Sequence, residues 1–148
     1  MALKFGLDGK LYYCAAGIGG TPTWLEFTGV KNVTNPNSLK EVDVTTRANA
    51  GYEATDGRLK QTHIECEVPL DPTNAGYQAV ENAYINNSVI GVADMTGTIT
   101  TSGERGLWAD CKVTQFDREE NIDGVMMMKI TFKPCYSANP PIFKIVTA

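Results

Sequence analysis

The stretch from Leu39 to Leu70, LKEVDVTTRANAGYEATDGRLKQTHIECEVPL, decides the predicted fold. Apolar and polar residues alternate in its first part, Leu39 to Thr46, and again in its last part, Gln61 to Leu70. Alternation with a period of two in segments rich in β-branched residues is typical of half-buried β-strands. Each predicted strand has an acidic face and an apolar face, the latter formed by Val42 and Val44 in one strand and by Ile64, Cys66 and Val68 in the other.

A Gly-rich, charged segment, residues 47–60, joins the two predicted strands. Its length of about fourteen residues exceeds the roughly two to five residues of an ordinary hairpin connection. Long loops in compact domains are usually functional or disordered, and this one contains ionic and aromatic side chains. We therefore expect the loop to make intermolecular contacts, through Arg47, Tyr52, Glu53, Asp56 and Arg58.

Length and charge restrict the possible functions. A chain of 148 residues is long enough for one domain with a sizeable core. The net charge of −4 argues against sequence-independent binding of nucleic acid, and a single His excludes a site built from several His ligands. The N-terminus lacks the charged and apolar regions of a signal peptide, and no apolar run approaches the length of a membrane span. We expect a soluble chain made in the cytosol.

The cysteines are far apart in the sequence and form no C-x-x-C pair, which argues against a metal or redox motif. Three of them lie in predicted strands, where a free Cys behaves as a small buried hydrophobe. A disulfide or a thiol at a subunit contact is the alternative. The residues concerned are Cys14, Cys66, Cys111 and Cys135.

The rest of the chain predicts mainly β-structure with one helix. Residues 75–87 show the helical spacing of apolar residues, whereas the other periodic segments are short and alternate. One of these, Trp24 to Thr34, is expected to bend at Gly29 and to bury Leu25, Phe27 and Val33. Roughly eight short strands separated by turn signals indicate a β-sandwich or small barrel. Residues 1–9 and 135–148 are predicted to be extended arms.

No catalytic constellation or cofactor motif is recognisable, so we predict neither an enzyme nor a cofactor. His63 has no sequence neighbours that indicate a triad. Glu65 and Glu67 share one strand face, and either acid/base chemistry or a solvated acidic surface fits that spacing. A small carbohydrate- or peptide-binding β-sandwich is an alternative function, for which Trp24 and Trp108 are the aromatic candidates.

Several short motifs follow one another in a characteristic order. They are Trp24 followed by GVKNV at 29–33, EVDVTTR at 41–47, GYE at 51–53, GRL at 57–59, a helix from Gly76-Tyr77 to Ala83-Tyr84, and a closing strand at 125–134. In order and spacing this set resembles the major tail tube proteins of long-tailed, siphovirus-type bacteriophages. The resemblance spans roughly residues 24–134.

The resemblance implies a single tail-tube domain over residues 1–148, with a fold shared with the tube proteins of type VI secretion. It implies a structural subunit that self-assembles into stacked hexameric rings in the virion tail, after synthesis in the host cytoplasm. The loop at 47–60 and both arms would join successive rings, and the further partners would be the tail terminator, tape measure and distal tail proteins. The expected arm contacts are Leu3, Phe5, Ile142, Phe143 and Ile145.

A tail tube conducts DNA, which passes without specific binding and without a membrane partner. An acidic lumen would keep the DNA mobile, because like charges repel whereas lysines would bind its phosphates. The acidic strand faces make Glu41, Asp43, Glu65 and Glu67 candidates for lumen-facing residues. The strands at 107–116 and 125–133 are alternative candidates for the lining.

Overall fold

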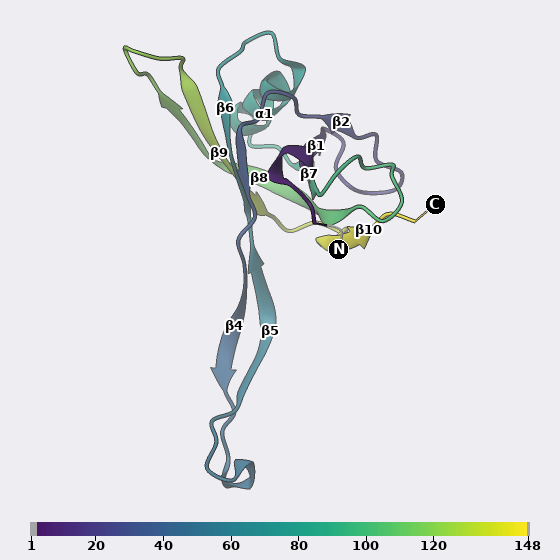
Figure 1. Cartoon of the computed structure of the whole chain (residues 1–148), viewed down its shortest axis with the longest axis vertical. Helices are drawn as coiled ribbons and strands as arrows, with labels where there is room; N and C mark the ends of the chain where they lie inside the picture. Colours follow the sequence, from purple (N-terminus) through teal and green to yellow (C-terminus); the bar gives the residue numbers. More distant parts are fainter. Residues whose placement is uncertain (1–2, 148) are drawn as a thin grey trace.

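The computed structural model describes residues 3–147, without the side chains of Asn49 and Arg58. It contains one α-helix, α1 (Ala75–Ile85), among short strands (Figure 1). The strands are β1 (Lys10–Cys14), β2 (Leu25–Glu26), β3 (Asn32–Thr34), β4 (Asn37–Asp43), β5 (Thr55–Thr62), β6 (Ile64–Pro69), β7 (Ile90–Met95), β8 (Arg105–Glu119), β9 (Met127–Pro134) and β10 (Ile142–Ile145). The predicted fold class, mainly β with a single helix, is confirmed.

Most strands form one eight-stranded sheet in the order β2-β1-β7-β8-β9-β6-β3, with β10 paired to β8. All of these pairs are antiparallel. The sheet is open, because β2 and β3 lie at its two ends and do not pair with each other. The longest strand, β8, connects the two halves: it pairs with β7 along one edge, and with β10 and then β9 along the other.

The core lies on the face of the sheet that α1 covers. Alternation in β6 buries Ile64, Cys66 and Val68, as the sequence predicts, and β9 contributes Met128, Ile130 and Phe132. The helix contributes Tyr77, Val80 and Ala83, and its N-cap is Asn74, whose side chain accepts a hydrogen bond from the Gly76 N–H. A smaller cluster on the other face contains Tyr12, Ala93 and Met95.

The Leu39–Leu70 stretch differs from the prediction in its pairing. The predicted loop at 47–60 contains the first part of β5, and β5 pairs with β4 to form a separate two-stranded sheet. The second predicted strand is divided at His63, so that β6 belongs to the main sheet. The connection between β4 and β5 therefore spans only residues 44–54. Figure 1 shows this β4–β5 hairpin projecting away from the body of the molecule.

Two further predictions, both for residues 24–34, need correction. Trp24 to Thr34 forms two strands rather than one, separated by a turn in which Gly29 has φ +83°. Only Phe27 of its three core candidates is buried, whereas Leu25 and Val33 are exposed. The predicted C-terminal arm contains the extended strand β10, which pairs with β8. None of the helices among residues 3–147 is long and apolar enough to cross a membrane.

Candidate assembly surfaces

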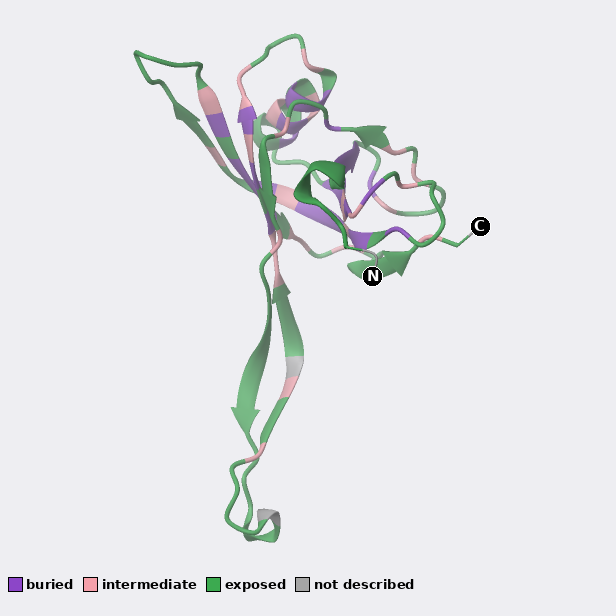
Figure 2. Cartoon of the chain, viewed as in Figure 1, coloured by how far each residue is buried: buried purple, intermediate pink, exposed green. Residues whose placement is uncertain are grey.

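The β4–β5 hairpin presents an apolar face that nothing in the chain covers. Every residue of β4 is exposed, and Figure 2 shows most of the hairpin in the colour of exposed residues. Val42, Val44 and Leu59 lie on one face, with exposed fractions of 56%, 46% and 65%. An isolated two-stranded hairpin is only marginally stable in water. The half-buried character predicted for β4 therefore does not hold within a single chain.

The connection at the end of the hairpin is held by short-range hydrogen bonds. The Asp43 carboxylate accepts bonds from the hydroxyl of Thr45 at 2.6 Å and from its N–H at 2.9 Å, which lower the pKa of Asp43. The Thr45 hydroxyl in turn accepts the Ala54 N–H at 2.9 Å. The turn itself needs positive φ at Ala50 (+54°) and Gly51 (+86°). The tip is thus a defined structure.

The residues predicted for the contact loop are divided between the tip and β5. Arg47 and Glu53 lie in the tip with Tyr52, whose side chain is 77% exposed. Asp56 lies in β5, directly opposite Val42 on the apolar face of the hairpin. Arg58 is also in β5, at a register shift between the strands, and its side chain lies outside the described residues.

Both predicted arms carry exposed apolar side chains. Leu3 and Phe5 precede a short 3-10 helix, Gly6–Asp8, and are 70% and 71% exposed. An ion pair between Lys4 and Glu104 holds this segment, and the hydrogen bond from Lys4 is the main cause of the lowered pKa of Glu104. In the C-terminal arm, the backbone of β10 pairs with β8 while its apolar side chains face solvent: Ile142, Phe143 and Ile145.

The four acids predicted for a lumen lie in two different sheets. Glu41 and Asp43 are on β4 of the hairpin, whereas Glu65 and Glu67 are on β6 of the main sheet. Glu65 and Glu67 alternate with the buried residues of β6 and so face away from α1. They share this face with Lys129 and polar residues of β8 and β9. Glu65 and Glu67 therefore lie on the same sheet surface as the strands named as the alternative lining.

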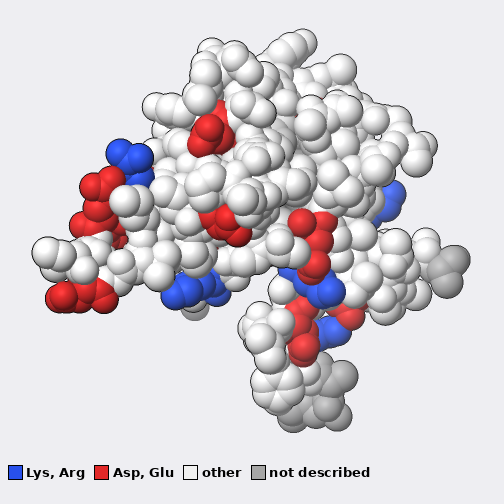
Figure 3. Space-filling view, turned by 90° about the horizontal axis from the view of Figure 1, so that it is seen from above, with Lys and Arg blue, Asp and Glu red and all other residues white. Residues whose placement is uncertain are grey.

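A second group of acidic residues lies at the end of the β8–β9 hairpin, in and beside the run DREEN at 117–121. Figure 3 shows Asp and Glu gathered at the left of the view, where this hairpin projects. The strand β8 extends to Glu119, so most of the run at 117–121 belongs to the strand. The exposed residues that form this acidic end are Asp117, Glu119, Glu120 and Asp123.

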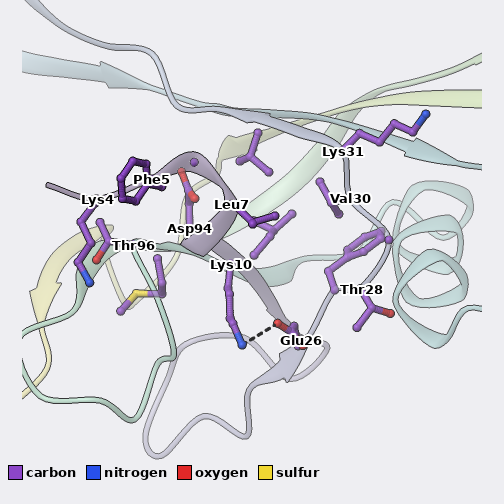
Figure 4. Close-up of a pocket in the computed structure, with 17 residues that line it drawn as sticks. Lys4, Phe5, Leu7, Lys10, Glu26, Thr28, Val30, Lys31, Asp94 and Thr96 are labelled. Atoms are coloured by element: carbon purple, nitrogen blue, oxygen red, sulfur yellow. Dashed lines mark ion pairs between the residues drawn. The ribbon is translucent and has the colours of Figure 1, made fainter.

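A groove of about 560 Å³ lies beside the N-terminal arm, between that arm, the segment 28–33 and the end of β7. Lys10 and Glu26 form an ion pair across part of it at 3.4 Å. Asp94 lies beside Phe5 and Leu7 at one end of the groove, while Lys31 lies at the other (Figure 4). Burial raises the pKa of Asp94 to about 6. Sequence reasoning missed Asp94, although an acid within the apolar run 89–95 is a visible signal.

The two tryptophans proposed for a binding module pack against each other. Their rings meet edge to face with centroids 5.2 Å apart, and Lys144 lies over the Trp108 ring at 4.8 Å. The Trp24 indole nitrogen is buried without a hydrogen-bond partner among the described residues. Such a pair stabilises the smaller apolar cluster, so these rings do not form an exposed aromatic surface, and the binding-module alternative is not favoured.

The described residues contain no cluster of three or more His, Cys, Asp or Glu that could hold a metal ion. Three of the cysteines are buried, and burial raises the pKa of Cys66 and Cys111 to about 12. Their thiols therefore stay protonated near neutral pH, as expected for buried side chains that pack as hydrophobes.

Comparison with known proteins gave matches among solved structures alone. No family model and no curated protein matches the chain. The tail of an empty gene transfer agent particle with C6 symmetry superposes with a TM-score of 0.72 at 12% identity, covering 98% of this chain and 100% of the other. The SPP1 tail tube gives 0.73 at 14% identity, over 99% of this chain and 81% of the other.

A third similar structure comes from the baseplate of the anti-feeding prophage, with a TM-score of 0.65 at 6% identity over 100% of this chain and 99% of the other. These likenesses extend over nearly the whole chain, including the projecting hairpin and both arms. The chain therefore has the fold of phage tail tube proteins.

Proposed function

We propose that this chain is the structural subunit of a tail tube, which self-assembles into stacked hexameric rings and conducts DNA from a phage-like particle into its host. Its location is then the virion tail, and its assembly takes place in the host cytoplasm. The observation that carries the proposal is the β4–β5 hairpin, because an exposed apolar hairpin that projects from the body is unstable unless copies of the chain cover it.

The open sheet supports ring formation. Strands β2 and β3 end the sheet and leave backbone groups free to pair with another chain. A contact between two different surfaces of identical subunits either closes into a ring or propagates as a filament. Edge-to-edge contacts would close the ring, and the hairpin with the two arms would join one ring to the next.

The contact residues proposed for ring stacking are those expected from the sequence. At the hairpin they are Arg47, Tyr52, Glu53, Asp56 and Arg58, and in the arms they are Leu3, Phe5, Ile142, Phe143 and Ile145. Their exposure supports this role wherever the side chains are described. The single domain over residues 1–148 with its arms would be the repeating unit.

For the lumen, Glu65 and Glu67 are the better supported candidates. They lie on the face of the main sheet opposite α1, where a wall of paired strands would enclose a bore. Glu41 and Asp43 lie in the two-stranded sheet of the hairpin. All four acids could line one lumen only if the hairpin of each subunit lay beside the main sheet of a neighbouring subunit. We further propose contacts with a tail terminator, a tape measure protein and a distal tail protein at the tube ends.

Electron microscopy of the purified chain at high concentration tests the function. We expect rings or tubes with a central hole, and a wild-type chain that remains monomeric would contradict the proposal. Tyr52→Ser at the hairpin tip should yield a folded monomer that stacks poorly. Ile122→Ser provides the control, because Ile122 is an exposed apolar residue that lies outside the hairpin and both arms. Equal damage by both variants would argue against a role of the tip.

A further inference from the structure

We infer that the groove beside the N-terminal arm is the receptor for the β4–β5 hairpin of a second copy of this chain, with Lys40 of one copy paired to Asp94 of the other. This inference rests on the proposed function and names the surface that receives the hairpin. It is argued from two surfaces that share no residues, the apolar hairpin face and the groove.

The hairpin face combines an apolar centre with one charge of each sign. Val42, Val44 and Leu59 form the centre. Lys40 lies opposite Leu59, and Asp56 lies opposite Val42, two positions closer to the tip along β4. Lys40 takes part in none of the ion pairs found among the described side chains. It is therefore available for a partner outside the chain.

The groove has the complementary arrangement. Phe5, Leu7 and Val30 provide apolar lining, and Asp94 and Lys31 lie toward its two ends (Figure 4). The other charged residues of the lining already have partners: Lys4 pairs with Glu104, and Lys10 pairs with Glu26. Asp94 and Lys31 have no ion-pair partner among the described side chains. The groove thus offers one acid and one base for an incoming segment.

The free energy of covering the groove favours a cationic occupant. Any segment that covers the apolar lining also removes the remaining water from Asp94, and a buried carboxylate without a partner is strongly unfavourable. An aliphatic occupant would leave that penalty in place. The hairpin supplies apolar side chains for Phe5, Leu7 and Val30 and an ammonium group for Asp94. Its Asp56 can then meet Lys31 at the other end.

The hairpin of the same chain does not fill this groove. None of the lining residues belongs to β4, β5 or their connection, and Figure 1 shows the hairpin extending away from the body. Seven residues of β4 reach about 23 Å at the rise of an antiparallel strand, enough to cross onto a neighbouring subunit. Because the two surfaces differ, the contact is heterologous and propagates from copy to copy, as a stack of rings requires.

A double-mutant cycle on assembly tests the pair. Lys40→Gln should raise the critical concentration for tube formation about tenfold, because it leaves Asp94 of the neighbour covered and unpaired. Asp94→Asn should have a smaller effect, since the amide is neutral. The double variant should then assemble no worse than Lys40→Gln alone. Lys60→Gln is the matched control: Lys60 lies in the same hairpin but opposite Leu39, outside the apolar face, and should change little.

Zero-length cross-linking with a carbodiimide gives a second readout that does not depend on folding of a variant. In tubes formed from equal amounts of ¹⁴N- and ¹⁵N-labelled wild-type chain, an amide between the Lys40 amine and the Asp94 carboxyl should appear as mixed-isotope peptide pairs. Mixed pairs would show that the bond joins two copies. Pairs within one isotope only would show contact within a chain and would overturn the inference.

The remaining outcomes separate the inference from the function on which it rests. The wild-type chain could form tubes while the two substitutions act independently, so that their effects on the critical concentration multiply, or while neither has an effect. Either result would overturn the Lys40–Asp94 pair and leave the tube function intact. Damage by Lys60→Gln equal to that by Lys40→Gln would do the same. A wild-type chain that forms neither rings nor tubes would overturn the proposed function and the inference together.

Discussion

Replacing Asp94 by Asn should stabilise the folded monomer at neutral pH. Asp94 lies in a strand whose other residues are buried, and burial raises its pKa from the ordinary value of 3.8 to about 6. The folded state therefore holds the proton more tightly than the unfolded chain does. The stabilising contribution of protonated Asp94 is complete below about pH 4 and is lost as the pH rises through about 6.

The size of the effect follows from the two pKa values. Each pKa unit corresponds to about 1.4 kcal/mol, so complete ionisation would destabilise the fold by up to about 3 kcal/mol. Asp94 is only partly buried, and solvent screening reduces this figure to about 1–2 kcal/mol. Asn has nearly the same shape and no charge. At pH 8 the variant should therefore be more stable than the wild type by about 1–2 kcal/mol.

Urea unfolding of both chains between pH 4 and pH 8, at a concentration below that of assembly, measures the difference. Other carboxyl groups titrate in the same range, and the pKa values of Asp43 and Glu104 are lowered, so the wild-type curve alone is ambiguous. The difference between the chains removes these contributions, because both contain them. It should be near zero at pH 4 and rise to its full value above pH 7. A difference independent of pH, or a variant less stable at pH 8, would refute the reasoning.

Three further substitutions test the packing and the hairpin. Phe132→Ala should lower the free energy of unfolding by about 3–5 kcal/mol in urea titrations, because Phe132 is 1% exposed in the core. Gly106→Ala should prevent normal pairing of β7 and β8, measured by circular dichroism and solubility, since a Cβ there would lie 1.9 Å from the Asp94 carbonyl oxygen. Asp110→Ala removes acceptors for the Ile18 N–H at 2.7 Å and the Ser137 hydroxyl, and should cost about 1–3 kcal/mol and speed proteolysis near residues 135–141.

The parts of the fold that the sequence predicts are those buried by the chain itself. The alternation of Ile64, Cys66 and Val68 places β6 correctly, because their apolar side chains meet the core of the same molecule. Helical spacing likewise identifies α1, where Tyr77 and Val80 are buried. In these elements the local pattern and the tertiary packing agree, so the pattern alone is sufficient.

The errors occur in segments whose burial or strand boundaries depend on contacts with distant parts of the chain rather than on the local sequence pattern. Val33 is predicted to be buried in a long strand but lies in a three-residue strand at the end of the sheet, where it is exposed. The connection between β4 and β5 is shorter than the predicted loop at 47–60, because residues 55–60 belong to β5. The sequence of β5, TDGRLKQT, lacks the alternation typical of a strand and contains Gly57, so it resembles a loop. A Cβ at Gly57 would lie 2.6 Å from the Leu39 side chain, so the glycine permits close approach within a strand rather than a turn.

The hairpin also explains why the candidate site could be predicted only in part. The alternation of Val42 and Val44 indicates burial, yet the isolated chain leaves both exposed. A cover supplied by another copy, as proposed above, would account for the apolar pattern in β4. The periodicity of a sequence indicates which residues favour burial, but it does not indicate which molecule would bury them. Asp94 would be the complementary case under the inferred contact, because Lys40 of a second copy would then pair with an acid in a buried strand. If the inferred contact forms, the exposed apolar face of the hairpin and the partly buried Asp94 would both be explained by one interface between copies.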